Sequence, residues 1–157
     1  MRLTIRPAEA TDICSMAELR AQTKGTQAFW TERIDKYLRG EHSPQKALEL
    51  RSAFIAVDKG KTVGFVAGHL TRRFECDGEV QWIDVDQQRR RKGIAYKLMA
   101  QIGAWFVSQN AKRICVNVDA NNMAARKLYE NCGARPMNKA WMVWDDSSRF
   151  CTLVTEY

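Results

Sequence analysis

A dense run of basic residues comes directly before an amphipathic segment. From position 89 the chain reads Arg89, Arg90, Arg91, Lys92, Gly93, Ile94 and Ala95. The first amides of a helix have no intrahelical partner and lie at the positive end of its dipole, so a helix that begins here can donate hydrogen bonds to phosphate oxygens. Gly93 lets the backbone approach a ligand, and the basic side chains add charge. The segment therefore predicts an anion site, with a solvated basic loop as the alternative.

A wider pattern surrounds this turn. The spacing V-x-x-x-x-R-x-x-G-x-A, formed by Val85, Arg90, Gly93 and Ala95, resembles motif A of the GNAT superfamily of acyl-CoA N-acyltransferases, whose turn holds the coenzyme A pyrophosphate. A second string, at positions 118–133, is similar to the family's V-x-x-x-N-x-x-A-x-x-L-Y-E-x-x-G. The departures are Gln87, Arg91 and Ala134, where many members have proline, glycine and an aromatic residue. The resemblance runs from Ile5 to about Trp144.

The resemblance implies that acetyl-CoA is the co-substrate. It puts the pantetheine arm against the strand that ends at Val85, like an added strand. A bulge in this strand and its divergence from the strand at Arg113–Val118 would open the slot. The residues that would contact the coenzyme are Ile83, Asp84, Val85, Arg90, Arg91, Lys92, Gly93, Ile94, Ala95, Asn122, Ala125 and Tyr129.

Acetyl transfer to an amine needs a neutral amine and protonation of the leaving thiolate. Tyr129 matches the family's tyrosine near the coenzyme sulfur, where a phenol can act as general acid; a core tyrosine is the alternative. Glu79 is the first candidate for the base, because some members carry a glutamate on this strand, and Asp84 is the second. Either could instead be a solvated carboxylate at a strand end. His69 is interpreted as a hydrogen-bonded strand histidine.

The resemblance also predicts where the acceptor binds, which is beside the first two helices and the link between them. Trp30 and Tyr37 would form aromatic walls, and Glu32 would attract a cationic amine, although Glu32 could equally belong to an exposed helix face. A small-molecule amine is the leading acceptor. A protein or peptide amine and a non-catalytic module that binds acyl-CoA or nucleic acid are the alternatives. Nucleic acid is disfavoured, because the basic residues do not interleave with aromatic ones.

Length and composition fit a globular chain. Its 157 residues correspond to one domain, 1–157, with 45% hydrophobic and 27% charged residues and a net charge of +7. Apolar runs such as Thr62–Leu70 are shorter than the roughly 18 to 20 residues of a membrane helix. The beginning of the sequence lacks the features of a secretory signal, so we expect a cytoplasmic protein. Five scattered cysteines and two histidines predict reduced thiols and no metal site.

The hydrophobic periodicity predicts an α/β (α+β) fold, a GNAT-like mixed and mostly antiparallel sheet flanked by helices. The expected order is β-α-α-β-β-β-α-β-α-β-β. The strands are expected at Leu3–Arg6, Ala53–Val57, Thr62–Leu70, Glu79–Val85, Arg113–Val118, Ala140–Trp144 and Phe150–Tyr157. The helices are expected at Asp12–Ala21, Phe29–Leu38, Ile94–Phe106 and Asn122–Asn131. Edge strands near the C-terminus would allow a homodimer.

Overall fold

One mixed sheet of seven strands runs through the part of the chain that the computed structural model describes, residues 2–90 and 93–150. The strands are β1 (Leu3–Pro7), β2 (Ala47–Asp58), β3 (Lys61–Thr71), β4 (Gly78–Val85), β5 (Ile114–Asn117), β6 (Arg135–Pro136) and β7 (Trp141–Trp144). Their order in the sheet is β1-β2-β3-β4-β5-β7-β6. Only β4 and β5 are parallel within this described sheet, and all other neighbours are antiparallel.

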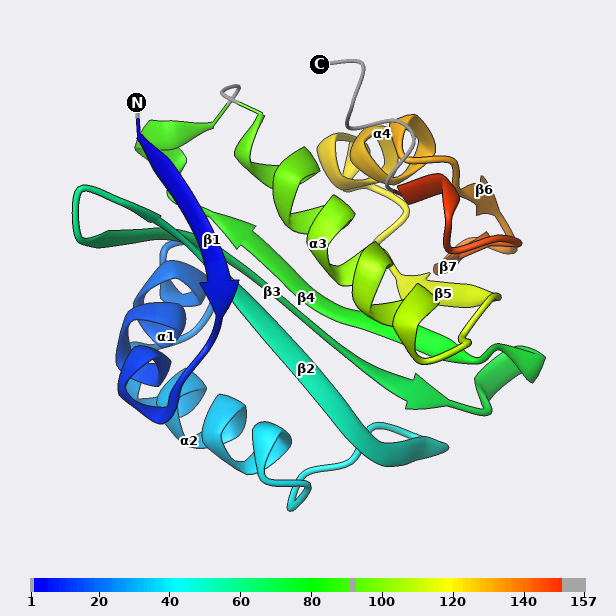
Figure 1. Cartoon of the computed structure of the whole chain (residues 1–157), viewed down its shortest axis with the longest axis horizontal. Helices are drawn as coiled ribbons and strands as arrows, with labels where there is room; N and C mark the ends of the chain where they lie inside the picture. Colours follow the sequence, from blue (N-terminus) through cyan, green and yellow to red (C-terminus); the bar gives the residue numbers. More distant parts are fainter. Residues whose placement is uncertain (1, 91–92, 151–157) are drawn as a thin grey trace.

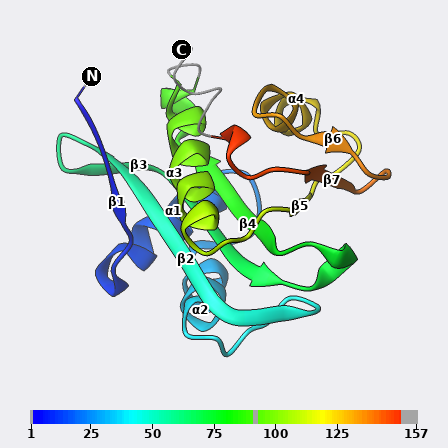
Figure 2. The same cartoon turned by 45° about the vertical axis from the view of Figure 1, so that its right-hand side comes forward.

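Helices cover both faces of this sheet (Figure 1). One face carries α1 (Ile13–Ala21) and α2 (Gln27–Leu38), and the other carries α3 (Ile94–Ser108) and α4 (Met123–Asn131). Single 3₁₀ turns lie at Ala10–Asp12, Arg73–Glu75 and Gln87–Arg89. In the turned view, α4 lies with β6 and β7 at the end of the molecule opposite β1 (Figure 2). The predicted fold class and order of elements are confirmed.

Two hydrophobic cores hold these layers together. On the α3 face, Leu98, Ile102 and Phe106 follow one another at helical spacing and are fully buried over β2, β3 and β4. On the other face, Ile34 of α2 is buried against the sheet, and Trp82 of β4 belongs to the same core. β4 therefore contributes side chains to both cores, Trp82 to this one and Val80 to the one under α3.

The structure departs from the sequence-based expectation at the start of β2 and at the C-terminal segment. The strand expected at Ala53–Val57 extends back to Ala47, because its first residues continue the ladder to Thr71 through a register shift. The strand expected at Phe150–Tyr157 is wrong at its first residue, since Arg149 and Phe150 are helical and Phe150 is buried. Residues 151–157 lie outside the described residues. The last two strands are instead β6 and β7, a pair that follows α4.

Replacing Gly78 with alanine is expected to lower the free energy of unfolding by about 1–3 kcal/mol. The added Cβ would lie 2.5 Å from Cε1 of Phe106 and 2.9 Å from Cδ1 of Ile114, and both neighbours are fully buried. Urea denaturation measures the change. The control is Val107→Ala, an exposed position on α3 beside Phe106, which should change stability by less than about 0.5 kcal/mol. Equal denaturation midpoints for Gly78→Ala and the wild type would contradict the expected steric overlap with Phe106 and Ile114.

Candidate functional site

The sheet is split between its two parallel strands. β4 pairs with β5 at Gly78, Glu79 and Val80, the last opposite Val116, and then continues to Val85 without a partner on that side among the described residues. The split begins at a β-bulge: Ala67 of β3 is opposite Trp82 and Gly68 is opposite Val80, so Gln81 is the extra residue. The predicted bulge and the predicted divergence of the two strands are therefore confirmed.

Helix α3 begins at a glycine with a left-handed backbone. Gly93 is its N-cap with φ 77° and ψ 5°, a conformation that side chains with a Cβ adopt at a cost. A Cβ built at Gly93 would meet no described heavy atom within 4 Å. Because glycine has no side chain to cap the helix, the first amides of α3 are not covered from that position. Ile94 is buried in the core and anchors this helix end, and Ala95 is half-buried.

The basic residues before Gly93 do not behave alike. Arg89 forms an ion pair with the buried carboxylate of Asp58, so its charge is used inside the fold. Arg90 is exposed with an extended backbone. Arg91 and Lys92, which were predicted to add charge, lie outside the described residues. Arg90 is thus the described basic side chain of this turn that carries no ion pair.

Tyr129 projects from α4 into the core. Its ring packs edge-to-face against Trp144 with 5.7 Å between centroids, and the residue is 6% exposed. Burial, with a smaller contribution from the charge of Asp84, raises the pKa of the Tyr129 phenol above its ordinary value. Within the described part of the chain, the hydroxyl makes no hydrogen bond. Tyr129 is therefore both a core residue and a phenol that keeps its proton.

Asn122 and Ala125, the other predicted coenzyme contacts at the start of α4, both have contacts within the fold. The Asn122 side chain caps the helix, accepting a hydrogen bond of 3.1 Å from the amide of Ala125. This is the ordinary use of asparagine at a helix start. Ala125 is half-buried against the core on the α3 face.

Asp84 is held in an ion pair. Its Oδ2 lies 2.9 Å from Nη1 of Arg20, and both side chains are mostly buried. The Arg20 guanidinium lies 4.3 Å from the centroid of Trp30, which fixes it in place. Desolvation raises the pKa of Asp84, and Arg20 opposes this rise. A carboxylate held in this way is poorly suited to collect a proton from an incoming amine.

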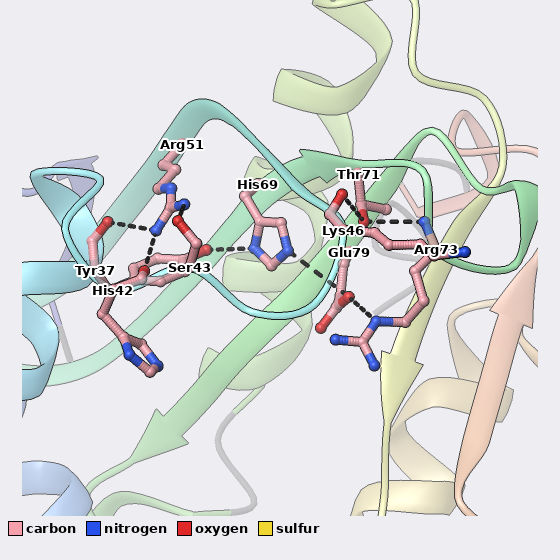
Figure 3. Close-up of polar contacts among 9 residues, drawn as sticks. All are labelled: Tyr37, His42, Ser43, Lys46, Arg51, His69, Thr71, Arg73 and Glu79. Carbon is pink, nitrogen blue, oxygen red and sulfur yellow. Dashed lines mark hydrogen bonds and ion pairs between the residues drawn. The ribbon is translucent and has the colours of Figure 1, made fainter.

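Glu79 is the centre of a polar chain that joins α2, β3, β4 and the turn between β3 and β4 (Figure 3). Its Oε1 lies 3.2 Å from Nε of Arg73 and 3.7 Å from Nε2 of His69. The other ring nitrogen of His69, Nδ1, lies 2.7 Å from the Tyr37 hydroxyl. Burial raises the pKa of Tyr37 well above its usual range. His69 is thus hydrogen-bonded on one side, as expected from the sequence, but its second nitrogen faces the preferred base candidate.

The residues predicted for the acceptor wall have different surroundings from those expected. Tyr37 is fully buried and Trp30 is 8% exposed, with its indole N–H donating to the carbonyl of Lys24. These two aromatic residues pack in the core, so neither presents an aromatic face to a ligand. Glu32 is exposed, pairs with Lys36, and lines a shallow groove of about 620 Å³ between the start of α1 and α2.

Sequence reasoning missed Arg73. It lies in the turn between β3 and β4, where the chain has no motif, and it contacts Glu79 only because this turn folds back over the sheet. The one signal in the sequence was the pair Arg72-Arg73 directly after the β-rich run. That signal does not distinguish a solvated turn from a buried guanidinium.

The described part of the chain shows neither a metal-binding cluster nor a helix that could cross a membrane. No group of three histidine, cysteine or acidic side chains there is arranged to hold a metal ion. Cys14, Cys76, Cys115 and Cys132 are free thiols. None of the helices in residues 2–90 and 93–150 combines the length and the apolar composition needed to cross a bilayer.

Curated proteins match about half of this chain. N-acetylaspartate synthetase of Homo sapiens is 36% identical over 86 residues, which are 54% of this chain and 28% of that protein. N-alpha-acetyltransferase daf-31 of Caenorhabditis elegans is 35% identical over 83 residues, or 50% of this chain and 46% of that protein. The chain spans less than half the length of each of these relatives.

Solved structures match nearly the whole described chain in fold. A putative acetyltransferase of the GNAT family from Desulfovibrio desulfuricans superposes with a TM-score of 0.75 at 14% identity, over 92% of this chain and 99% of that one. The NatC complex bound to Gag peptide and CoA gives a TM-score of 0.69 at 16% identity, with the same coverage of 92% and 99%. At these identities the likeness concerns the fold. The sequence profile of the Acetyltransferase (GNAT) family, however, matches residues 19–134, and this protein therefore belongs to that family.

Proposed function

We propose that this protein transfers an acetyl group from acetyl-CoA directly to the primary amine of a small molecule. The observation that carries the proposal is the split sheet: the bulged β4 parts from β5 after Val80, and the glycine-capped start of α3 follows β4 in the chain. A strand edge with free hydrogen-bonding groups suits an extended, amide-containing arm. A helix start without a side-chain cap suits a diphosphate. Membership of the GNAT family supports the combination of both.

The chain's residues fit coenzyme A at both of these places. The edge of β4 beyond Val80 has backbone groups that β5 does not pair, so residues 81–85 would hold the pantetheine amides. The amides of Ile94 and Ala95 would hold the diphosphate, with Arg90 nearby as an exposed cation. A Cβ at Gly93 would point into open space, so ligand atoms can come close to this backbone. Arg91, Lys92, Asn122 and Ala125 remain proposed contacts.

In the proposed reaction a nitrogen–carbon bond forms, the thioester carbon–sulfur bond breaks, the amine loses a proton and the sulfur gains one. The coenzyme supplies the acetyl thioester. Tyr129 would protonate the departing sulfur as general acid, because its raised pKa keeps the phenol protonated until then, and it would regain a proton from solvent. Glu79 would take the amine proton. It is preferred to Asp84, since Asp84 has a hydrogen-bonded arginine on its carboxylate, whereas Oε1 of Glu79 has no hydrogen-bond partner among the described residues.

A peptide amine is the second candidate acceptor. The relative from Caenorhabditis elegans, 35% identical over 83 residues, is named an N-alpha-acetyltransferase, whereas the human relative is named for the synthesis of N-acetylaspartate. The two names differ in acceptor size but agree in acetylating an amine. Short peptides therefore belong in the acceptor panel beside small amines.

Thiol release from acetyl-CoA, measured against a panel of small amines and short peptides, tests the proposed function. We expect acetyl-CoA to bind and at least one small amine to accelerate thiol release above the rate of hydrolysis. Acceleration by peptides alone would move the assignment to the second candidate. Failure of acetyl-CoA to bind at millimolar concentration would overturn both.

Gly93→Val is expected to raise the Kd of coenzyme A by about tenfold or more, because a β-branched residue disfavours the left-handed backbone and its methyl groups crowd the helix start. Isothermal titration calorimetry measures the change. Gly93→Asn is the matched variant, since asparagine tolerates the left-handed region. If only the backbone conformation matters, Asn restores binding; if close approach of the diphosphate matters, both variants bind weakly. A wild-type Kd for Gly93→Val would mean that the diphosphate binds elsewhere.

Tyr129→Phe is expected to lower kcat about 10- to 100-fold while changing the Kd of acetyl-CoA much less, because phenylalanine keeps the packing against Trp144 but removes the donor. Steady-state kinetics and calorimetry on the same preparation measure both. Equal losses in kcat and binding would point to a structural role. An unchanged kcat would remove Tyr129 from the reaction.

The protonation state of Tyr129 can be measured directly. The difference in ultraviolet absorbance between the wild type and Tyr129→Phe should contain no tyrosinate signal at the ordinary pKa of 10. Since the folded pKa is raised, the unfolded chain ionises first as the pH increases, so the contribution of Tyr129 to stability is complete below pH 10 and is lost above it. A tyrosinate signal from folded protein at pH 10 would contradict this.

A further inference from the structure

Three buried polar atoms without hydrogen-bond partners meet at one point of the structure. They are Oε1 of Glu79, Nε2 of His69 and Nε of Arg73. Glu79 is 4% exposed and His69 is fully buried, so water in the bulk does not solvate them. The contacts that join them, at 3.2 Å from Arg73 and 3.7 Å from His69 to Glu79, do not have hydrogen-bond geometry. Buried polar groups are rarely left unpaired in proteins, and several at one place indicate that a polar molecule binds there.

The turn that carries Arg73 is built to hold its side chain over the sheet. The Arg73 amide donates to Oγ1 of Thr71, and this hydroxyl donates to the carbonyl of Lys46 (Figure 3). Phe74 and Glu75, directly after Arg73, have positive φ values of 54° and 60°. Non-glycine residues in this region cost free energy, and such residues are concentrated at functional sites. The turn therefore has strain that a simple solvated connection would not need.

The Arg73 guanidinium is fixed on two sides and open on the third. Its central carbon lies 4.7 Å from the ring centroid of Trp141, and its Nε faces Glu79. Its side chain is 17% exposed, and its two terminal nitrogens make no hydrogen bond to any residue in 2–90 or 93–150. A planar guanidinium held in this way presents two parallel N–H groups, which match the two oxygens of a carboxylate.

This cluster lies beside the gap proposed for the acetyl group. Glu79 is one residue before the last position at which β4 pairs with β5, and Trp141 is opposite Asn117, the last residue of β5. Glu79 and His69 are opposite each other on β4 and β3, on the α1 and α2 face. An amine that enters the gap from this face would therefore have Glu79 next to its nitrogen and Arg73 next to the group attached to it.

We infer that the acceptor is an amine with a carboxylate close to its nitrogen, such as a free amino acid, and that Arg73 binds this carboxylate. This inference rests on the proposed function and makes Arg73 the specificity-determining residue. An amine with no carboxylate would leave the half-buried guanidinium without an anion at its terminal nitrogens, and that loss is the physical basis of the discrimination.

The first experiment compares an amino acid with its carboxamide as acceptors. In the wild type, we expect KM for the carboxylate to be about 10- to 100-fold lower than for the carboxamide. Arg73→Gln should remove most of this difference in KM while the Kd of acetyl-CoA is unchanged, and Arg73→Lys should be intermediate because it keeps the charge but not the two-pronged geometry. The matched control is Arg72→Gln, which removes the same charge from the same turn and should keep the wild-type ratio.

A further arm separates a free amino acid from a peptide. A dipeptide amide whose only carboxylate is the first side chain should be a poorer acceptor than the free amino acid. If the dipeptide amide is the better acceptor, the carboxylate bound by Arg73 belongs to a peptide, and the acceptor is not a free amino acid.

Binding can be measured without turnover. Calorimetry on the protein saturated with coenzyme A should give tighter binding of an N-acetylated amino acid than of its amide, and Arg73→Gln should abolish the difference. Equal binding of the two ligands by the folded wild type would overturn the inference, as would an unchanged ratio in a folded Arg73→Gln variant. Equal turnover of amines with and without a carboxylate would overturn this inference alone. Failure to bind acetyl-CoA would overturn the proposed function.

Discussion

The parting of β4 from β5 determines where every candidate site residue can act. All four residues of β5, Ile114–Asn117, pair with β7, but only three of its positions pair with β4. The bulge at Gln81 changes the direction of β4 at the point where this pairing stops. Since buried backbone groups in proteins are almost always paired, an unpaired stretch of a central strand is costly unless something else pairs with it. An extended ligand arm is the simplest partner of this kind.

Packing keeps the two strands apart. Trp144 of β7 is fully buried, with its indole N–H donating to the carbonyl of Cys132, and Tyr129 of α4 packs against it. These contacts hold β5, β7 and α4 together as one unit of the core. β4 is held to β3 and to the helices of both faces, through Trp82 on one side and Val80 on the other. The gap therefore has a packed core on both sides, which suits a site that must orient a thioester.

The two family motifs could be recognised in the sequence because each lies within one short segment. The residues of the proposed acceptor site come from separate segments. The helix start at Gly93 lies within one short segment, and the family resemblance implied both this helix start and the bulged strand before it. The polar chain of Tyr37, His69, Glu79 and Arg73 joins α2, β3, β4 and a turn, and no spacing predicts it. For the same reason Trp30 and Tyr37 were expected to line a pocket: helical periodicity shows that aromatic residues share a face, but not whether that face meets a ligand or the sheet.

Net charge is a weak guide to this protein's ligand, because the arginines that matter are mostly used inside the fold. Arg20 is paired with Asp84, Arg89 with Asp58, and Arg51 donates to the carbonyls of Tyr37 and His42. Arg73 differs from these three, because its partner Glu79 contacts only Nε and the hydrogen-bond geometry is poor. A buried ion pair with one partner left unsatisfied contributes little to stability. The presence of this pair at the edge of the gap is better explained if a substrate completes its hydrogen bonds. The substrate's ammonium group would bind Glu79, and its carboxylate would bind Arg73.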